Sequence, residues 1–379
     1  MTNQPGYDVE VAVIGAGALG TAVAATLAPD HSVLVIERHE GSGRETSSHN
    51  SGVIHAGIYY PTGSLKHRAC IEGNALLYEW CEQRNVVHRR CGKLIVALTD
   101  DEFDGLDAVV EQASANGVPG ISRLSGAEAR ALEPAVPAAG ALLSESSGVV
   151  DQAGLVRSFE GAAIERGALV AYQHEVLAAE RDDAGFRLEL RDADGQRSEL
   201  RATALVNAAG HGAPRIAAAL GYPLDGAGEV PRLRQTASRG RYYDVVGSGV
   251  AQAVTRLIYP LPDHAGAALG VHLTIDTDGA LHLGPDATWL DDAATLDYRN
   301  NDDARAEFLA AGQRLLPALT DEDLAPGQVG YRPKLHDAGE PQADFLVWHD
   351  EGYVHLGGIE SPGLTSAIPL ANLVADVLR

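Results

Sequence analysis

Hydrophobic positions near the start of the chain follow two patterns in turn. Val9 to Ile14 is a mostly apolar run rich in Val, which is typical of a buried parallel strand. From Leu19 onward, apolar or small residues recur at i, i+3, i+4 and i+7, as on one face of a helix, and Pro29 with Asp30 ends the pattern. A second apolar run follows from Val33 to Ile36. This order predicts a strand, a helix and a second strand.

Later segments have either helical or strand periodicity. Leu155 to Ile164 has the spacing of an amphipathic helix, whereas Phe186 to Leu190 alternates with period two, as a half-exposed strand does. Tyr242 to Leu283 has short apolar runs separated by Gly, Pro and Asp, which favours an antiparallel sheet. Tyr353 to Leu356 is a predicted strand, and Ser366 to Leu378 is a predicted helix. The patterns indicate a mixed α/β protein, α+β overall.

A hairpin and a further buried strand are expected in the middle of the chain. Asp192 to Gly195 predicts the turn into a hairpin partner. Ala204 to Val206 is expected to be a separate buried strand that runs into Asn207 and the small residues after it. Because such strand ends occur near both termini and in the middle, we expect a discontinuous Rossmann-type nucleotide-binding domain and an antiparallel-sheet substrate domain. The first is assigned residues 1–85, 145–225 and 328–379, and the second residues 86–144 and 226–327.

The first predicted turn has the spacing of a dinucleotide fingerprint. Gly15 permits the tight turn, Gly17 lets the backbone approach a pyrophosphate, and Gly20 lets the helix pack closely on the strand. A pyrophosphate is then stabilised by the helix N-terminus, and the carboxylate of Glu37 accepts the hydroxyl protons of an adenosine ribose. A 2′-phosphate is repelled there. The fingerprint does not distinguish NAD from FAD.

Charge excludes several classes of partner. The 379 residues include 29 Lys and Arg against 52 Asp and Glu, a net charge of −23. A negative field repels phosphate backbones, so we expect no nucleic-acid partner. An anionic substrate therefore requires a local cationic pocket.

Cysteine count and hydropathy indicate a cytoplasmic location. Cys70, Cys81 and Cys91 have neither an even count nor C-x-x-C spacing, so they are interpreted as reduced thiols, and no metal site is indicated. The N-terminus lacks a signal-peptide pattern, and no apolar stretch of about eighteen residues occurs. We expect no integral membrane segment, and docking at a membrane surface stays open.

Several motifs resemble a flavoprotein family. A loop from Gly41 to Gly52 supplies hydroxyls and amides where a long cofactor would continue towards its reactive ring. The chain resembles the FAD-dependent family of glycine oxidase, D-amino-acid oxidase and glycerol-3-phosphate dehydrogenase, and within it the L-2-hydroxyglutarate dehydrogenase/oxidase branch. The segments that carry the resemblance are 47–60, 64–66, 91–97, 116–120, 258–263, 269–272 and 283–286.

The resemblance implies FAD as cofactor and a set of cofactor contacts. Hydroxyls after the second strand would donate to the pyrophosphate or ribityl oxygens, small residues after the middle strand would allow close backbone approach, and the last helix would face the flavin's pyrimidine end. Besides Gly15, Gly17, Gly20 and Glu37, the implied contacts are Ala18, Arg38, Thr46, Ser47, Ser48, Asn50, Ser51, Val176, Ala208, Ala209, Gly210, Arg332, Gly358, Ser361, Gly363, Leu364 and Thr365.

The resemblance also implies catalytic residues. His55 and His272 are candidates for the general base that removes a hydroxyl proton, and the sequence does not decide between them. Arg332 matches the position that holds the substrate carboxylate in related oxidases, and its guanidinium suits a bidentate pair. Both histidines are open to the simpler interpretation of hydrogen-bonded core residues.

A second group of residues concerns the rest of the substrate. All three lysines, Lys66, Lys93 and Lys334, lie in or beside family-like motifs, and Lys66 is interpreted as either a distal-carboxylate contact or a structural residue. Possible hydroxyl donors to the substrate are Tyr59, Tyr60 and Tyr259. Arg241 stands where the family usually has an acid, which puts the preferred substrate in question.

Three functions remain as hypotheses. The leading one is FAD-dependent oxidation of L-2-hydroxyglutarate, or a close 2-hydroxy acid, to the 2-oxo acid by hydride transfer to flavin N5. The second keeps the flavin but oxidises an amine, as glycine and D-amino-acid oxidases do. The third is a flavin-binding protein without turnover. The electron acceptor, whether oxygen, a quinone or a carrier, stays open.

Overall fold

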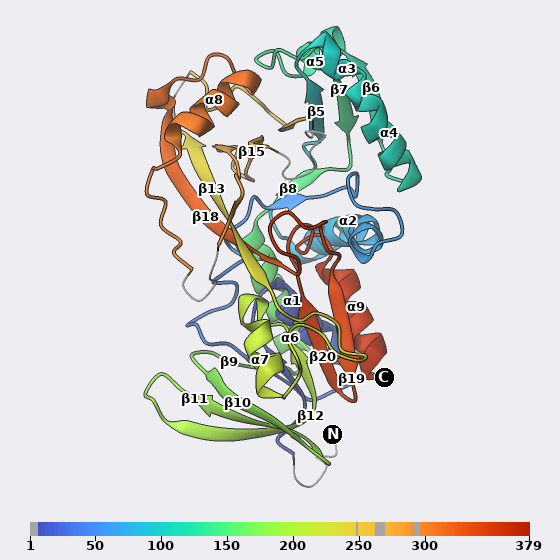
Figure 1. Ribbon diagram of the computed structural model, residues 1–379, viewed down its shortest axis with the longest axis vertical. Helices are drawn as coiled ribbons and strands as arrows, with labels where there is room; N and C mark the ends of the chain where they lie inside the picture. The colour runs from blue at the N-terminus through green and yellow to red at the C-terminus, as the bar shows by residue number, and fades with distance from the viewer. Residues whose placement is uncertain (1–6, 248, 262–269, 291–295) are drawn as a thin grey trace.

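The computed structural model describes residues 7–247, 249–261, 270–290 and 296–379. Pro262, Asp263 and Leu269, which belong to the family-like segments, lie outside the described residues. The described part is elongated, with one large sheet and its helices in the lower part of the view and a second large sheet in the upper part (Figure 1). The long strands β13 (Thr236–Val245) and β18 (Leu324–Lys334) run from the upper part to the middle.

Eight of the described strands form the lower sheet, in the order β10-β11-β12-β1-β2-β9, with β20 paired to β12 and β19 to β20. Their bounds are β1 (Val9–Ile14), β2 (Val33–Ile36), β9 (Leu169–Ala171), β10 (Glu175–Asp182), β11 (Gly185–Arg191), β12 (Arg197–Asn207), β19 (Leu346–Asp350) and β20 (Tyr353–Gly357). The predicted first strand and second strand are confirmed at both ends, and the helix between them is α1 (Ala18–Leu27).

The hairpin partner and the buried strand after it are one strand, which corrects the expectation of two. The first half of β12 pairs antiparallel with β11, from Arg197 opposite Arg191. Its second half continues without a break and pairs parallel with β1 and β20, ending at Asn207. The polar alternation of the hairpin changes to a continuous apolar run because the strand passes from the solvent-exposed hairpin into the covered sheet. Because the pattern changes midway along β12, the sequence predicted two strands where the structure has one.

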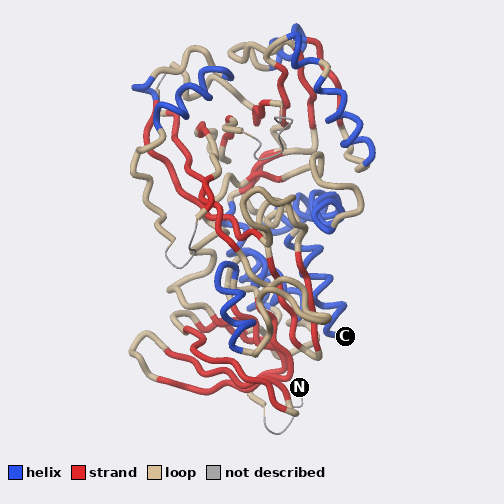
Figure 2. The backbone as a smooth tube through the Cα atoms, in the orientation of Figure 1, coloured by secondary structure: helices blue, strands red, loops and turns tan. Residues whose placement is uncertain are grey.

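Alternate residues of β1 serve two cores. Val11 and Val13 pack in a cluster with α1, α6 (Gln152–Glu165) and α9 (Ala367–Leu378), whereas Ala12 and Ile14 pack in a second cluster with β11 and α7 (Ala213–Ala219). Both faces of the parallel strands are therefore covered, which explains why no polar residue occurs from Val11 to Ile14. Figure 2 shows these helices beside the strands of the lower part.

Nine described strands form the upper sheet, in the order β17-β13-β16-β15-β14-β5-β7-β6, with β18 paired to β13. Besides β13 and β18, they are β5 (Lys93–Ala97), β6 (Ile121–Ser125), β7 (Gly140–Ser144), β14 (Leu257–Pro260), β15 (Leu273–Ile275), β16 (Leu281–Leu283) and β17 (Thr288–Trp289). The pairs are antiparallel except β14 with β5, which is parallel. The sheet is thus mainly antiparallel, as expected, with one parallel pair.

A small sheet and the remaining helices complete the described part. The small sheet has the order β3-β8-β4, with β3 (Val53–Ile54), β4 (His88–Arg89) and β8 (Gly148–Val150). The remaining helices are α2 (Leu65–Arg84), α3 (Asp100–Phe103), α4 (Gly105–Ala115), α5 (Gly126–Leu132) and α8 (Arg305–Leu315), with single 3-10 turns at Gly210–Gly212 and Asp321–Asp323.

The expected domain boundary at residue 328 falls inside β18. This strand pairs with β13 from Leu324 to Lys334 without a break in the chain. Because a domain boundary is expected where few contacts cross, we propose that the substrate domain continues to Lys334. The chain then returns to the lower sheet through β19 and β20.

Gly20 is the residue that allows α1 to lie against the first turn. A Cβ added there would lie 1.9 Å from the carbonyl oxygen of Gly15. Since that oxygen belongs to the backbone, Gly20→Ala is expected to lower the free energy of unfolding by about 1–3 kcal/mol, through overpacking, in urea titrations of the FAD-loaded protein. Gly161→Ala in α6 is the matched control, because a Cβ at Gly161 has no neighbour within 4 Å. The control is expected to be neutral or stabilising by up to about 1 kcal/mol. Equal unfolding energies for the two variants would contradict this packing account.

Candidate active site

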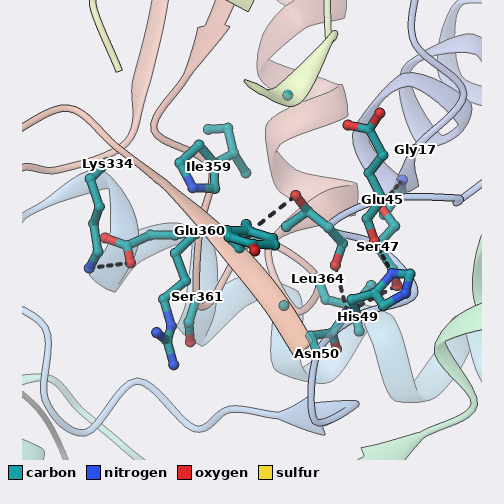
Figure 3. A pocket seen from close by; sticks show the side chains of 18 of the residues that line it. Gly17, Glu45, Ser47, His49, Asn50, Lys334, Ile359, Glu360, Ser361 and Leu364 are labelled. Carbon is teal, nitrogen blue, oxygen red and sulfur yellow. Dashed lines mark hydrogen bonds and ion pairs between the residues drawn. The ribbon is translucent and has the colours of Figure 1, made fainter. Parts of the chain in front are cut away.

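A cavity of about 720 Å³ runs from the first turn to the middle of the molecule. Its wall is formed by the end of β1, the loop after β2, the paired strands β13 and β18, and the segment after β20. Figure 3 shows Gly17, Glu45 and Ser47 at one end of it and Lys334 and Glu360 at the other. The cavity therefore joins the predicted nucleotide site to residues of the upper sheet.

Backbone groups form the nucleotide end of the cavity. Gly15 has φ +99°, and a Cβ there would lie 2.6 Å from the carbonyl oxygen of Ala208. The Ala208 amide in turn donates to Ile14 O at 3.0 Å. β1 and β12 thus bring two small-residue turns together, as the sequence predicted. Only a residue without a side chain fits this approach.

Glu37 is fixed at the end of β2. Its Oε2 accepts a hydrogen bond from the amide of Ala16 at 2.8 Å, and its Oε1 accepts one from the amide of His39 at 2.8 Å. The side chain is buried and lines the cavity. Each carboxylate oxygen keeps a further lone pair, so the geometry fits the predicted contact with two ribose hydroxyls.

The loop after β2 is held by its own side chains. Ser47 Oγ accepts from the amide of Ala18, the first residue of α1, at 2.9 Å. Asn50 Nδ2 donates to Thr46 O and Ser47 O, both at 3.0 Å. Ser48 Oγ donates to Glu45 O at 3.2 Å and does not line the cavity. Ser47 therefore faces the cavity at the helix N-terminus, whereas Ser48 supports the loop.

Most of the predicted cofactor contacts line the cavity. These are Gly15, Gly17, Ala18, Glu37, Arg38, Thr46, Ser47, Asn50, Ser51, Val176, Ala208, Ala209, Gly210, Arg332, Ser361, Gly363 and Leu364. Four predicted contacts are not in the lining: Gly20, Ser48, Gly358 and Thr365. Thr365 is buried and its Oγ1 accepts from the amide of His55 at 3.0 Å, so it fixes a neighbouring strand end rather than facing the cavity. Gly358 donates its amide to Gln235 Oε1 at 2.6 Å.

Both candidate histidines lie at the inner end of the cavity. His272 Nδ1 lies 2.9 Å from Gly270 O, and because a carbonyl only accepts, the proton is on Nδ1. Nε2 of a neutral His272 therefore carries a lone pair. The ring stacks on Tyr259 at 3.9 Å between centroids. His55 Nε2 lies 3.1 Å from Ser361 Oγ.

Both histidines are neutral at pH 7. Burial, together with the charges of Lys93 and Arg332, lowers the pKa of His272 to about 3, although its hydrogen bond to Gly270 opposes the shift. Burial also lowers the pKa of His55 far below its usual value, and the charges of Lys93 and His272 act in the same direction. A neutral imidazole is the form that accepts a proton.

Arg332 faces the cavity without a carboxylate partner among the described residues. Its Nη1 and Nη2 donate to the carbonyl oxygen of Asp286 at 3.1 and 3.2 Å. The Asp286 side chain is bound by Arg241, whose Nη2 lies 2.6 Å from Oδ2. Arg241 also pairs with Asp303 and does not line the cavity. Arg241 therefore holds the residue that positions Arg332, and its charge is balanced by Asp286 and Asp303.

The predicted substrate-binding residues separate into two groups. Tyr59, Tyr60 and Tyr259 line the cavity, and the buried hydroxyl of Tyr59 has no hydrogen-bond partner in the described part of the chain. Lys66 does not line it, because its ammonium is buried in an ion pair with Glu360 at 2.9 Å. Of the two interpretations of Lys66, the geometry supports the structural one.

Sequence reasoning missed several cavity residues. Lys334 and Glu360 line the cavity, as does Tyr242 on β13. Lys334 follows Arg332 by two positions in a strand, so the alternation of side chains was a usable signal. No sequence pattern marked Glu360 as a cavity residue, because its position depends on the conformation of the turn after β20.

Comparison with known proteins decides the family. The family model for FAD dependent oxidoreductases, DAO, matches residues 10–377. The chain belongs to this family. Its cofactor is FAD, which agrees with the glycine cradle, the fixed Glu37 and the size of the cavity.

Relatives of this FAD-dependent oxidoreductase cover nearly the whole chain. It is 35% identical to the mitochondrial L-2-hydroxyglutarate dehydrogenase of Arabidopsis thaliana, over 97% of this chain and 83% of that protein. It is 31% identical to an L-2-hydroxyglutarate dehydrogenase of Salmonella houtenae, over 96% of this chain and 92% of that protein. A dithionite-reduced L-alpha-glycerophosphate oxidase from Mycoplasma pneumoniae with FAD bound has a TM-score of 0.86 and 26% identity, over 98% of this chain and 94% of that one.

Within the described ranges, no helix combines the length and apolarity that crossing a membrane requires. The cytoplasmic location stays a prediction, since the Arabidopsis relative is named as mitochondrial.

The pKa of His272 has a consequence for stability. His272 stays neutral in the folded protein down to about pH 3, whereas the unfolded chain binds its proton below about pH 6.5. Stability is thus lost as pH falls through 6.5, and this one group accounts for about 1.4 kcal/mol between pH 7.5 and 5.5. We expect His272→Gln to reduce the pH dependence of the unfolding free energy by about that amount in urea titrations of the FAD-loaded protein. His349→Gln, at an exposed site on β19, is the control and should follow the wild type. An unchanged pH dependence in His272→Gln would show that His272 protonates in the folded state.

Proposed function

We propose that this chain oxidises L-2-hydroxyglutarate, or a close 2-hydroxy acid, to the corresponding 2-oxo acid. The observation that carries the proposal is the pairing of a cation and a base at one point of the FAD cavity. Arg332 has no ion-pair partner in the described part of the chain, and it contributes to the low pKa of His272. The named activity of the relatives at 35% and 31% identity supports the same substrate.

Arg332 would bind the carboxylate next to the hydroxyl-bearing carbon. Its guanidinium is held on one side by the carbonyl of Asp286 and lines the cavity with the other. A guanidinium forms two parallel hydrogen bonds to a carboxylate, which fixes the orientation of the carbon beside it. The substrate is thereby held with its hydroxyl towards the histidines and its C–H bond towards the flavin site.

His272 would remove the hydroxyl proton. Because Nδ1 donates its proton to Gly270 O, Nε2 is the one ring nitrogen of neutral His272 that can accept a proton. The low pKa of the free site rises when a carboxylate binds, because that charge offsets Arg332, one of the cations that lower it. Substrate binding thus strengthens the base at the moment it is needed.

FAD would be held by Glu37, Ser47 and the amides around Gly17, and when bound it supplies the acceptor for the hydride. His55, whose Nε2 contacts Ser361, would bind the substrate hydroxyl or the oxo product as a hydrogen-bond partner. The stacked Tyr259 keeps the His272 ring in place and excludes water from that side.

Charge disfavours the amine-oxidase interpretation. The cavity presents the cations Arg332 and Lys334 at its inner end, and the nearby Glu360 is bound by two lysines. An α-ammonium would add a further positive charge there, without a free carboxylate partner in the described lining. A hydroxyl adds no charge.

Anaerobic reduction of the bound flavin tests the substrate. We expect L-2-hydroxyglutarate to bleach the flavin absorption near 450 nm, while the D-enantiomer, glycine and D-amino acids leave it oxidised. The control is dithionite, which reduces the flavin whether or not the protein is active. Bleaching by glycine or D-amino acids alone would establish the amine-oxidase function instead. If dithionite bleaches the flavin but none of the acids does, the protein is a flavin binder without this turnover.

Paired histidine variants test the base. His272→Gln should lower the rate constant of flavin reduction by about 10²-fold or more, since it removes the proton acceptor. His55→Gln keeps a hydrogen-bonding group and should cost less, about tenfold. Stopped-flow absorption at saturating substrate measures both, and flavin content shows that the site is intact. A larger loss in His55→Gln would assign the base to His55.

A further inference from the structure

Lys334 lies beside Arg332 on the wall of the cavity. Both are in β18 and two positions apart, so their side chains point to the same side of the strand, about 7 Å from each other along it. Both line the cavity. Figure 3 shows Lys334 reaching Glu360, to which it is joined by a dashed line. The ammonium lies 2.5 Å from Glu360 Oε2.

Glu360 is shared between two lysines that lie at different depths. Its Oε1 is 2.9 Å from Lys66 Nζ, and Lys66 also donates to Ala343 O at 2.9 Å. The Lys66 side chain is 3% exposed and outside the cavity lining, whereas that of Lys334 is 13% exposed and within it. Lys66 thus anchors Glu360 from behind, and Lys334 is the cation that faces the cavity.

The same group touches the reaction centre through the next residue. Ser361 follows Glu360 in the chain, and its hydroxyl lies 3.1 Å from His55 Nε2. Glu360 and Ser361 line the cavity together with His55 and Tyr60. The ion pair of Lys334 with Glu360 is therefore one residue along the chain from a side chain that contacts His55.

The net charge of the four charged side chains Lys66, Lys334, Glu360 and Arg332 is complementary to that of a ligand with two carboxylates. Lys66 and Lys334 against Glu360 leave one positive charge, and Arg332 adds a second. One carboxylate would neutralise only half of it. Since an unbalanced charge in a partly buried site is costly, a ligand with two carboxylates is favoured over one with a single carboxylate.

We propose that Lys334 binds the second carboxylate of the substrate and so makes the enzyme selective for 2-hydroxy diacids. The proposal rests on the proposed function and adds the residue that sets the substrate class. Arg332 takes the carboxylate beside the hydroxyl, and Lys334 takes the distal one, while Lys66 holds Glu360 from behind. Selectivity follows because a monoacid leaves Lys334 without an added partner.

The test compares L-2-hydroxyglutarate with L-2-hydroxypentanoate, which has the same carbon chain and a methyl group in place of the distal carboxylate. The measured quantity is the ratio of kcat/KM for the diacid to that for the monoacid. Lys334→Gln is expected to lower this ratio by about 10- to 100-fold, the loss of one charge-assisted hydrogen bond. Lys334→Arg keeps the charge and should retain most of the ratio.

Glu360→Gln is the matched variant, because it cuts the same ion pair from the other side and leaves the Lys334 cation in place. It should keep or raise the diacid preference. Thermal unfolding and flavin content check that each variant is folded. Equal losses of the ratio in Lys334→Gln and Glu360→Gln, or a ratio that Lys334→Gln leaves unchanged, would overturn the assignment of Lys334. Wild-type flavin that L-2-hydroxyglutarate does not reduce would instead overturn the proposed function.

Discussion

The placement of cations at the inner end of the cavity is the constraint on which the site depends. The chain carries a net charge of −23, yet Arg332 and Lys334 line that end, and Lys93 is buried against Tyr259, which also lines it. Burying a cation is costly unless another group compensates it, and each of these has a different compensation. Lys334 has Glu360, Lys93 lies 3.9 Å from the centroid of the Tyr259 ring, and Arg332 has only a backbone carbonyl. The least compensated cation is the one predicted to take the substrate carboxylate.

The same charges set the protonation of the histidines. Lys93 lowers the pKa of both His55 and His272, and Arg332 lowers that of His272. A site built to attract an anion therefore also keeps its bases unprotonated while empty. In the proposed mechanism, the bound carboxylate would offset the charge of Arg332 and so raise the pKa of His272 again. Arg332 would thus couple substrate capture to proton removal.

The parts of the fold that the sequence predicted are those that depend on local patterns. Val9 to Ile36 forms a strand, helix and strand whose geometry is decided within the segment, by apolar runs and by Gly15 and Gly20. Both strands were predicted to the residue at both ends. β12 was split into two strands because its surroundings change midway, from an exposed hairpin to a covered sheet. The parallel pairing of β14 with β5 joins segments far apart in the chain, and no local pattern encodes it.

The residues of the candidate site divide in the same way, into those that local patterns predict and those that depend on distant segments. The nucleotide end uses backbone groups and small residues in consecutive motifs, and its predicted residues mostly line the cavity. The inner end depends on which side chains of distant segments meet. Lys66 and Lys334 are both lysines in or beside family-like motifs, yet only Lys334 lines the cavity. The difference depends on the register of β18 and on the turn that carries Glu360, the partner of both lysines.

This division means that the inner end can change without disturbing the nucleotide end. The nucleotide end is built from close backbone approaches, such as Gly15 against Ala208, which tolerate little change. The inner end is built from side chains on β13 and β18 and from the segment after β20, where one substitution changes the charge without moving the backbone. Arg241 shows the limit of such freedom. Its charge differs from the acid usual in the resembled family, but Asp286 and Asp303 balance that charge. Any effect of Arg241 on the substrate is therefore expected to pass through Asp286 to Arg332.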